Sequence, residues 1–336
     1  MPRHRKQSHT KTPPPLLSQE FLIQNHADII SVICILILLG LMFHPTNYIA
    51  SLFISPQYIE NATNVTIDAE LLKLQPSLNI RNYVYGKGVK DLCTIFFYTC
   101  VCMVLHAVLQ EYVWERISRR YHLSNTTSAK FYETGILAAF YLLSTVWGVM
   151  VIIEEKILSQ PSVLWSGYYD NHVKMPFITK FYYLIQLAYW LHCYPELYFL
   201  KVPFAFVPSR VKLYTIAFLF TAISYYLSLQ RFAICLLTME AISEVIASAA
   251  KLLHYLNNDE RAVFVFRRFW APAFCIVRVV SVLLAVLVLY YGFGTEDVAM
   301  TTRIGMLVPT ITLQILMSYV AFRAWKSVGK EVKKTQ

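Results

Sequence analysis

Eight apolar stretches, each close to the length needed to cross a lipid bilayer, make up most of this 336-residue chain. A hydrocarbon core of about 30 Å requires about 20 mostly apolar residues in a helix. Backbone N–H and C=O groups find no water in hydrocarbon, so these segments are predicted to be helices. The stretches are Ala27–Tyr48, Leu92–Val113, Phe131–Ile153, Phe177–Phe199, Val211–Leu229, Phe232–Leu253, Phe269–Phe293 and Ile304–Trp325.

The composition supports a membrane protein. Hydrophobic residues make up 57% of the chain and charged residues only 15%, which excludes an ordinary soluble protein. We therefore predict an all-α polytopic membrane protein with eight transmembrane helices.

The distribution of positive charge predicts the orientation, because cytosolic loops of membrane proteins are enriched in Lys and Arg. If both termini are cytosolic, about two thirds of the 30 Lys and Arg residues fall on the cytosolic side. Both termini are therefore predicted to be cytosolic. The net charge of +10 then reflects basic loops that meet anionic lipid headgroups, and we expect no nucleic-acid partner.

Two short signals concern the cellular location. Asn61 and Asn64 each begin a glycosylation acceptor tripeptide in the long loop 49–91, which is predicted to be luminal. Near the C-terminus, Lys333 and Lys334 resemble the dilysine retrieval signal of endoplasmic reticulum membrane proteins, which is read from the cytosol. Both signals favour a glycoprotein of the endoplasmic reticulum membrane.

No catalytic residue, metal or cofactor is predicted. All seven cysteines fall inside predicted spans, with neither metal-ligand spacing nor the pattern of a disulfide framework. The sequence contains no evident Ser-His-Asp set, and its ten glycines form no phosphate-binding loop.

Three ionisable residues lie deep inside predicted spans: Glu240, Glu244 and Arg278. Each costs about 2.5–3.5 kcal/mol at the centre of a membrane helix, so we expect them to face the bundle interior or water. Glu244 and Arg278 lie at about the same depth, roughly 14 Å from the cytosolic ends of their helices at 1.5 Å per residue. We therefore predict that Glu244 pairs with Arg278.

Three further polar residues lie on the fourth predicted span, namely Gln186, His192 and Glu196. Together with the charges of the sixth and seventh spans, they predict a polar intramembrane cavity that opens toward the cytosol. The alternative is a structural ion pair with interfacial residues near helix ends, which requires no ligand. The sequence leaves both interpretations open.

Three blocks of sequence resemble the translocating chain-associated membrane protein family. They run from Ser18 to Ile29 (SQEFLIQNHADI), from Tyr112 to Arg120 (YVWERISRR) and from Gln186 to Phe199 (QLAYWLHCYPELYF). The resemblance covers nearly the whole chain and is weaker after Val211. It implies an endoplasmic reticulum protein beside the Sec translocon channel. Its implied partners are nascent signal sequences and transmembrane segments, together with membrane lipids; the ribosome would be involved only indirectly.

The resemblance also implies a domain organisation. Residues 1–26 would form a cytosolic tail, and residues 27–113 the first two transmembrane helices with the glycosylated luminal loop 49–91. Residues 114–326 would form the six-helix TLC bundle that the family shares with ceramide synthases. Residues 327–336 would be a cytosolic basic tail that carries the dilysine signal.

The relationship to ceramide synthases raises an acyltransferase as a rival hypothesis. Those enzymes resemble this chain but carry two adjacent histidines where it has Leu213 and Tyr214. Glu240 stands in place of a further histidine, and Ala241 and Glu244 in place of two aspartates. Leu and Tyr offer no general base near neutral pH, so we predict that the protein is not an enzyme.

The leading hypothesis is therefore a membrane chaperone of the translocation channel. Lipid solvates the polar and basic flanks of a signal segment poorly, and a polar cavity would lower this cost. Glu240, Glu244 and Glu196 would act as acceptors, with Arg278 holding Glu244 in place. A lipid-binding or bilayer-thinning protein that uses the same cavity for a lipid headgroup is the alternative.

Overall fold

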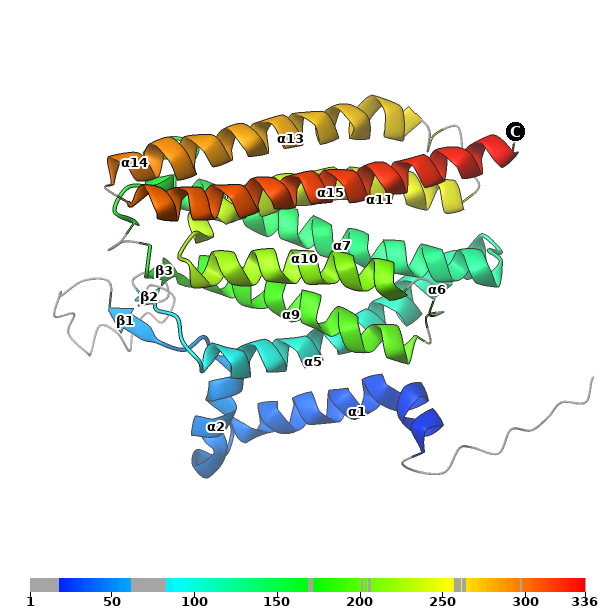
Figure 1. The fold of residues 1–336 in the computed structure, drawn as a ribbon. Coiled ribbons are helices and arrows are strands. Elements are labelled where there is room, and N and C mark those ends of the chain that lie inside the picture. Colours follow the sequence, from blue (N-terminus) through cyan, green and yellow to red (C-terminus); the bar gives the residue numbers. More distant parts are fainter. Residues whose placement is uncertain are drawn as a thin grey trace, which may run out of the picture.

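The computed structural model describes residues 18–61, 83–168, 172–200, 202, 204, 207–256, 261, 264–296 and 298–335. Long helices lie side by side, from α1 and α2 on one flank to α13 and α15 on the other (Figure 1). The α-helices are α1 (Gln19–Gly40), α2 (His44–Ile54), α5 (Asp91–Leu109), α6 (Glu115–Arg120), α7 (Asn125–Glu154), α9 (Phe177–Phe199), α10 (Val207–Tyr226), α11 (Gln230–Tyr255), α13 (Ala271–Ala285), α14 (Phe293–Thr295) and α15 (Met300–Thr335). Shorter turns are the π-helical η2 (Gln110–Trp114), η4 (Phe266–Trp270) and η5 (Val286–Gly292), and the 3₁₀ turn η3 (Pro161–Leu164).

The prediction of a helical multi-pass membrane protein is confirmed. Within the described residues, five helical segments are long and apolar enough to cross a bilayer: Gln19–Gly40, Asp91–Arg120, Asn125–Glu154, Gln230–Tyr255 and Arg268–Thr295. The other three predicted stretches coincide with α9, α10 and α15. The bounds of α9 are those predicted, Phe177–Phe199.

The first predicted span, Ala27–Tyr48, is wrong at both ends. Helix α1 begins at Gln19, where the Ser18 hydroxyl accepts a hydrogen bond from the backbone N–H of Phe21 and caps the helix. It ends at Gly40, and the chain turns into the separate helix α2, whose Pro45 lies in the first turn. Proline has no N–H to continue a preceding helix but is well suited to start a new one.

The helical segment observed at the second predicted span, Leu92–Val113, is longer than expected. Helix α5 continues through the π-helical turn η2 into α6, so one helical segment runs from Asp91 to Arg120. The domain boundary expected between residues 113 and 114 falls inside this continuous segment.

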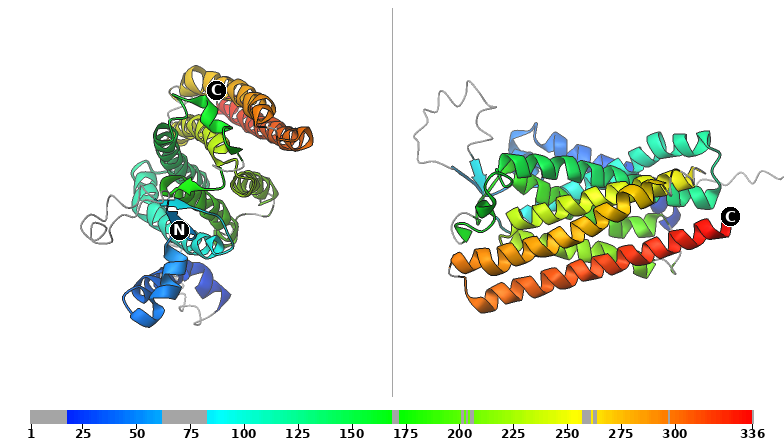
Figure 2. Two further views of the ribbon diagram at one scale, coloured as in Figure 1. Left: turned by 90° about the vertical axis from the view of Figure 1, so that its left-hand side faces the viewer. Right: turned by 90° about the horizontal axis from the view of Figure 1, so that it is seen from above.

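Helix α9 is the innermost of the long helices and packs against α5, α10 and α7. The end-on view in Figure 2 shows the other helices arranged around the middle of the bundle. Lys180, Gln186, His192 and Glu196 of α9 are all buried. Because neighbouring helices cover α9, its polar side chains meet protein rather than lipid, as expected for polar residues in a membrane helix.

Helices α7 and α11 share the most extensive helix contact, and Gly148 permits their close approach. A Cβ atom on Gly148 would lie 2.0 Å from the Thr238 hydroxyl oxygen and 3.1 Å from its Cβ. Small residues allow membrane helices to pack closely in this way.

A small antiparallel sheet lies at one end of the bundle and was not predicted. Its three strands, β1 (Ile59–Asn61), β2 (Tyr83–Tyr85) and β3 (Met175–Pro176), are ordered β1-β2-β3. Ile59 pairs with Tyr85 in the first ladder, and Tyr85 pairs with Met175 in the second. The sheet therefore joins the loop after α2 to the start of α9, a long-range contact that helical periodicity cannot reveal.

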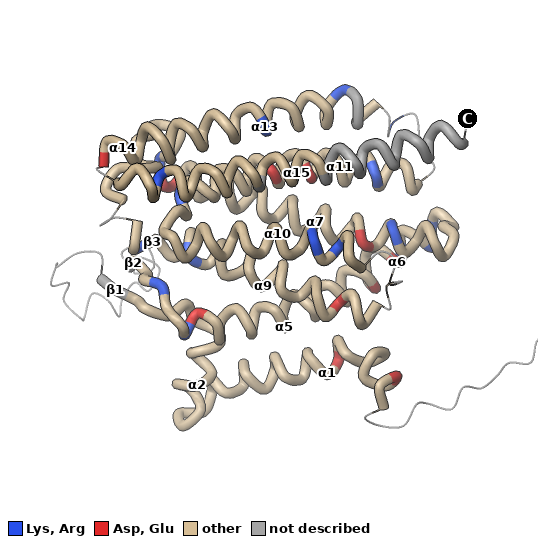
Figure 3. Tube along the Cα trace, viewed as in Figure 1, with Lys and Arg blue, Asp and Glu red and all other residues tan. Residues whose placement is uncertain are grey.

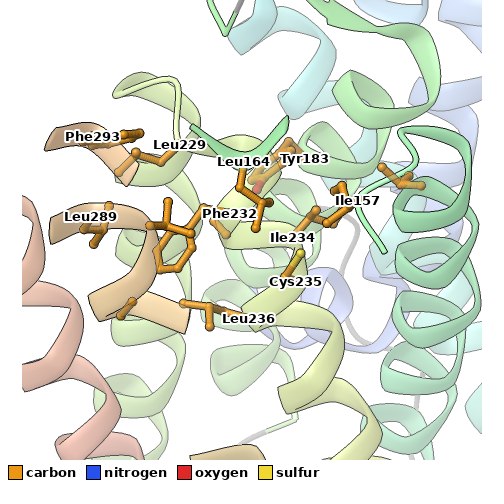
Figure 4. Close-up of a cluster of buried hydrophobic side chains, with 14 of the residues drawn as sticks. Ile157, Leu164, Tyr183, Leu229, Phe232, Ile234, Cys235, Leu236, Leu289 and Phe293 are labelled. Carbon is orange, nitrogen blue, oxygen red and sulfur yellow. The ribbon is translucent and has the colours of Figure 1, made fainter. Parts of the chain in front are cut away.

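A large hydrophobic cluster lies at the same end, between α11, η5 and the segment around η3 (Figure 4). Phe232 and Leu236 of α11 contribute to it together with Leu289 and Phe293, and Leu164 covers it from the loop side. Leu227 and Leu229 of the short connection between α10 and α11, residues 227–229, pack in or against this cluster.

Charged residues gather toward the two ends of the bundle, and few lie between them (Figure 3). Large apolar side chains are exposed along the outer helices, including Leu36 of α1, Leu142 of α7 and Leu283 of α13. This pattern is typical of a surface that faces lipid.

Candidate functional site: two pockets and an intramembrane ion pair

Arg278 of α13 pairs with Glu240 of α11, so the predicted pairing with Glu244 is wrong by one helical turn. Arg278 also donates a hydrogen bond of 2.8 Å to Oε1 of Gln314 on α15. The depths were counted from predicted helix ends, and the observed ends lie elsewhere. One turn advances the chain by 5.4 Å, so small errors at helix ends select the wrong carboxylate.

Glu240 also lines a narrow pocket between α7, α9, α10, α11 and α15, which we call the central pocket. It encloses about 60 Å³, enough for a few water molecules. Most of its walls are apolar or aromatic, and its polar groups come from Ser144, Gln186, Glu240 and Gln314. The remaining lining residues are Phe140, Tyr141, Trp190, Leu213, Ile216, Ala217, Phe220, Leu236, Leu237 and Ala241.

Gln186 takes part in a buried polar chain beside the central pocket. Its side-chain N–H donates to the Ser144 hydroxyl at 2.6 Å, and that hydroxyl lies 3.0 Å from the Tyr182 hydroxyl. The chain links α7 to α9 and satisfies polar groups that would be costly if left unpaired in a low-dielectric interior.

A second pocket, which we call the end pocket, lies where α5 passes into η2, α7 and α10 begin and α9 ends. It encloses about 750 Å³. His192 and Glu196 line this pocket and not the central one. Its other lining residues are His106, Gln110, Asn125, Thr126, Ser128, Ala129, Lys130, Tyr132, Glu133, Ile136, Leu137, Tyr189, Cys193, Leu197, Leu200, Val202, Arg210 and Tyr214.

The predicted single cavity is therefore two pockets. A packed cluster that includes Phe140, Tyr189, Trp190 and Tyr214 lies between their polar groups. Gln186 and Glu240 lie on one side of it, and the His192–Glu196 wall lies on the other. Among the described residues, Glu244 lines neither of the two pockets, and Arg278 reaches the central one only through Glu240 and Gln314.

Two histidines that the sequence did not single out lie close to Glu196. His106 Nδ1 is 3.5 Å from Glu196 Oε1, and His26 Nε2 is 3.7 Å from Oε2. His106 Nδ1 also lies 3.4 Å from His192 Nε2. These residues come from α1, α5 and α9, so no local sequence pattern connects them.

Sequence reasoning also missed a buried ion pair between Asp91 at the start of α5 and Lys180 near the start of α9. The carboxylate oxygen and the ammonium nitrogen are 2.7 Å apart, and both side chains are almost fully buried. Asp91 directly precedes an apolar stretch and could have been read as a helix-start residue, but nothing in the sequence identifies its partner.

The structure describes only part of the predicted glycosylation and retrieval signals. Asn64 lies outside the described residues, and Asn61 ends strand β1. Helix α15 runs through Lys333 and Lys334 to Thr335. Among the described residues, no group of three or more His, Cys, Asp or Glu side chains is placed to hold a metal ion.

The two positions that matter for the acyltransferase hypothesis lie beside the pockets. Leu213 lines the central pocket, and Tyr214 lines the end pocket. Neither side chain can take up a proton as a general base near neutral pH, so the imidazole pair of ceramide synthases has no counterpart at these positions.

Comparisons with known proteins agree with the fold. Residues 130–326 match the model of the TLC domain family. The chain is 40% identical to human translocating chain-associated membrane protein 2 over 84% of its length and 72% of the relative. It is 37% identical to the mouse protein of that name over 94% of its length and 85% of the relative. A sphingosine N-acyltransferase-like protein from Alternaria alternata is 28% identical over 56% of this chain and 44% of that protein.

The fold and its buried polar groups define a multi-pass helical membrane protein of the TLC class. Identity over most of the chain and of both relatives places it more narrowly. The chain belongs to the family of translocating chain-associated membrane proteins.

Proposed function

We propose that this protein lies beside the Sec translocon channel in the endoplasmic reticulum membrane and assists nascent secretory and membrane proteins. It would do so by contacting signal sequences and transmembrane segments as they enter the bilayer. The observation that carries this proposal is the 37–40% identity, over most of the chain, to relatives named as translocating chain-associated membrane proteins.

The central pocket supplies a physical rationale. A signal segment with a polar residue is poorly solvated by hydrocarbon, where an unpaired polar group costs several kcal/mol. Glu240 Oε1 is buried and has no hydrogen-bond partner among the described residues. At about 60 Å³, the pocket has room for a polar side chain of a passing segment but not for a helix. Arg278 and Gln314 would hold Glu240 in position.

The experiment is site-specific crosslinking of nascent chains in microsomes that lack the endogenous protein and receive purified variants. The wild-type protein should crosslink to signals of marginal hydrophobicity, and Glu240→Gln should reduce this crosslinking when equal amounts of folded protein are compared, because the change also leaves Arg278 unpaired. Glu115→Gln, which changes an exposed carboxylate on α6, is the matched control. The proposal would be refuted if wild type and Glu240→Gln both gave no more crosslinked product than the background in microsomes without the protein.

We further propose eight membrane crossings with both termini in the cytosol, a luminal loop 49–91 and the domain organisation expected from the sequence. The excess of Lys and Arg on the side of the termini supports this topology. Removing the acceptors with Asn61→Gln and Asn64→Gln should abolish the mass shift that glycosidase treatment produces. Exchange of Lys333 and Lys334 for Ser should release the protein to later compartments. A glycan-free wild-type protein would contradict the luminal placement of the loop.

A further inference from the structure

A buried group of hydrogen-bond acceptors lies at the edge of the end pocket, around its lining residue Glu196. His26 Nδ1 lies 2.9 Å from the carbonyl oxygen of Ile23, and a carbonyl can only accept, so this nitrogen carries the hydrogen. In a neutral imidazole, Nε2 is then an acceptor. It faces Glu196 Oε2, and neither atom has a hydrogen-bond partner among the described residues.

Hydrogen-bond donors are also scarce around the other carboxyl oxygen of Glu196, Oε1. His192 Nδ1 lies against the carbonyl oxygen of Tyr189 and therefore donates, which leaves Nε2 as an acceptor. Only His106 Nδ1 lies between this acceptor and Glu196 Oε1, at 3.4 and 3.5 Å. One N–H thus serves two acceptors, so a cationic N–H donor from a ligand would complete the hydrogen bonds of this buried carboxyl group.

A second part of the pocket lining, on α7 and α10, carries positive charge. Arg210 of α10 pairs with Glu133 of α7, and Lys130 lies one turn before Glu133. A guanidinium has five N–H donors, so the single contact with Glu133 leaves capacity for an anion. Arg–phosphate pairs are among the stronger hydrogen bonds that proteins make.

Apolar side chains also line the pocket, among them Ile136, Leu137, Leu197 and Leu200. The pocket lies where α7 and α10 begin and α9 ends, so its lining residues belong to the ends of long helices. The ends of helices that cross a bilayer lie near the lipid headgroups. Its volume of about 750 Å³ lies within the range of small-molecule sites. The π-helical turn η2 begins at Gln110 in its wall, and such turns occur frequently at functional sites.

We propose that the end pocket binds the headgroup of a zwitterionic glycerophospholipid whose ammonium carries N–H bonds, with Glu196 receiving the ammonium and Arg210 the phosphate. A trimethylammonium headgroup has no N–H to offer, so the pocket selects a primary amine. A basic peptide segment fits less well because it would leave the remaining N–H donors of Arg210 without an acceptor. The site involves α5 as well as the TLC domain and is independent of the central pocket and of the proposed translocation role.

The test uses the full chain in nanodiscs that contain equal amounts of phosphatidylethanolamine and phosphatidylcholine. After a detergent wash, the lipids that stay bound are quantified by mass spectrometry. We expect the bound ratio to favour phosphatidylethanolamine about tenfold over the input, since a hydrogen bond to a charged group corresponds to at least this factor. A bound ratio equal to the input would overturn the proposal.

Variants test the roles proposed for Glu196 and Arg210 in binding the ammonium and the phosphate. Glu196→Gln should return the bound ratio to near the input. The double change Glu133→Gln and Arg210→Gln removes the cation without leaving an unpaired carboxylate, and it should lower the total amount of bound phospholipid. Glu240→Gln, the same change in the central pocket, should alter neither quantity. Equal losses for Glu196→Gln and Glu240→Gln would contradict the assignment.

Ala129→Trp tests whether the lipid occupies the end pocket without changing any charge. Ala129 is exposed at the pocket lining, so the indole should fill the site without disturbing the core, and bound phosphatidylethanolamine should be lost. Retention of the lipid in this variant would overturn the proposal, even if Glu196→Gln fails to fold. Binding of a basic signal peptide that Glu196→Gln abolishes, with no phospholipid enrichment, would instead identify a peptide site.

Discussion

Asp91 and Lys180 form an enclosed ion pair, with the carboxylate oxygen Oδ1 and the ammonium nitrogen 2.7 Å apart. The ammonium also donates hydrogen bonds to the carbonyl oxygens of Gln57 at 2.7 Å and Gly86 at 2.8 Å. The Tyr225 hydroxyl donates to Asp91 Oδ2 at 2.9 Å. One pair thus connects α5, α9 and α10 with the chain segments that flank the sheet.

Asp91→Asn should destabilise the protein by about 3–5 kcal/mol, because it leaves a buried ammonium without its counter-charge. The measurement is thermal unfolding of the purified protein in detergent, together with the yield of folded protein. Asp91→Asn combined with Lys180→Met should recover part of the loss. The matched control is Arg119→Gln in the solvent-exposed Arg119–Glu115 pair, for which the loss should be about 0.3–0.5 kcal/mol. Similar losses for the buried and the exposed pair would contradict this prediction.

Arg278 should couple energetically to Glu240 and not to Glu244. Arg278→Gln leaves Glu240 unpaired inside the bundle, so addition of Glu240→Gln should restore stability, with a coupling free energy of about 0.5–3 kcal/mol. A double-mutant cycle based on thermal unfolding measures it. The cycle with Glu244→Gln is the control and should be additive. If the larger coupling belongs to Glu244, the observed pairing is wrong.

Gly148→Ala should destabilise the contact between α7 and α11 by about 1–3 kcal/mol, because the new methyl group collides with Thr238. Addition of Thr238→Ala removes the hydroxyl and methyl groups in its way and should recover part of the loss. Gly305→Ala on α15 is the control, since no atom of the described residues lies within 4 Å of its added Cβ. Thermal unfolding compares the three variants. Equal effects at the two glycines would show that close approach at Gly148 is unimportant.

His172 should make the fold sensitive to acid. Its burial in the loop before β3, reinforced by the charge of Arg231, lowers the pKa of the imidazole to about 4. In the unfolded chain the pKa is about 6.5, so on acidification the unfolded state binds the proton first and the folded state loses stability between about pH 6.5 and 4. From pH 7 to pH 5 this loss should be about 2 kcal/mol.

The measurement compares thermal unfolding at pH 7 and pH 5 for the wild-type protein and for His172→Phe. Phenylalanine keeps an aromatic ring at the site but cannot be protonated, so the variant should lose less stability on acidification. The difference between the two proteins isolates His172 from the carboxylates that titrate in both. Identical pH dependence would exclude His172 as the source.

The position of α9 illustrates what can be predicted about the fold. Its bounds, Phe177–Phe199, follow from the length of the apolar stretch alone, because a bilayer fixes how many residues a crossing needs. The end of α1 at Gly40 was missed, since hydrophobicity continues past it. There the turn depends on Pro45 and on hydrogen bonds from Thr46 and Asn47 to the carbonyls of Gly40 and Leu41.

For the candidate site as well, the sequence predicted some features and missed others. The sequence identified Glu240, Glu244 and Arg278 as charges that should face the bundle interior or water, because charge in a membrane helix is costly. It also identified Glu196 as part of a polar interior. It did not identify their partners. Helix ends are uncertain by several residues from sequence, and one turn of error exchanges Glu240 for Glu244. His26 and His106 meet Glu196 from two other helices, which no spacing within one helix can indicate.

The sequence by itself determined the class of protein, since length and apolarity leave a chain in lipid few alternatives to helices, and it determined the family through the blocks that resemble it. The packing of the helices was needed to see that the polar residues form two pockets rather than one, that Arg278 binds Glu240, and that Lys180 is enclosed beside Asp91. Hydrophobicity is a property of a segment, whereas pairing depends on how helices far apart in sequence rotate and slide against each other.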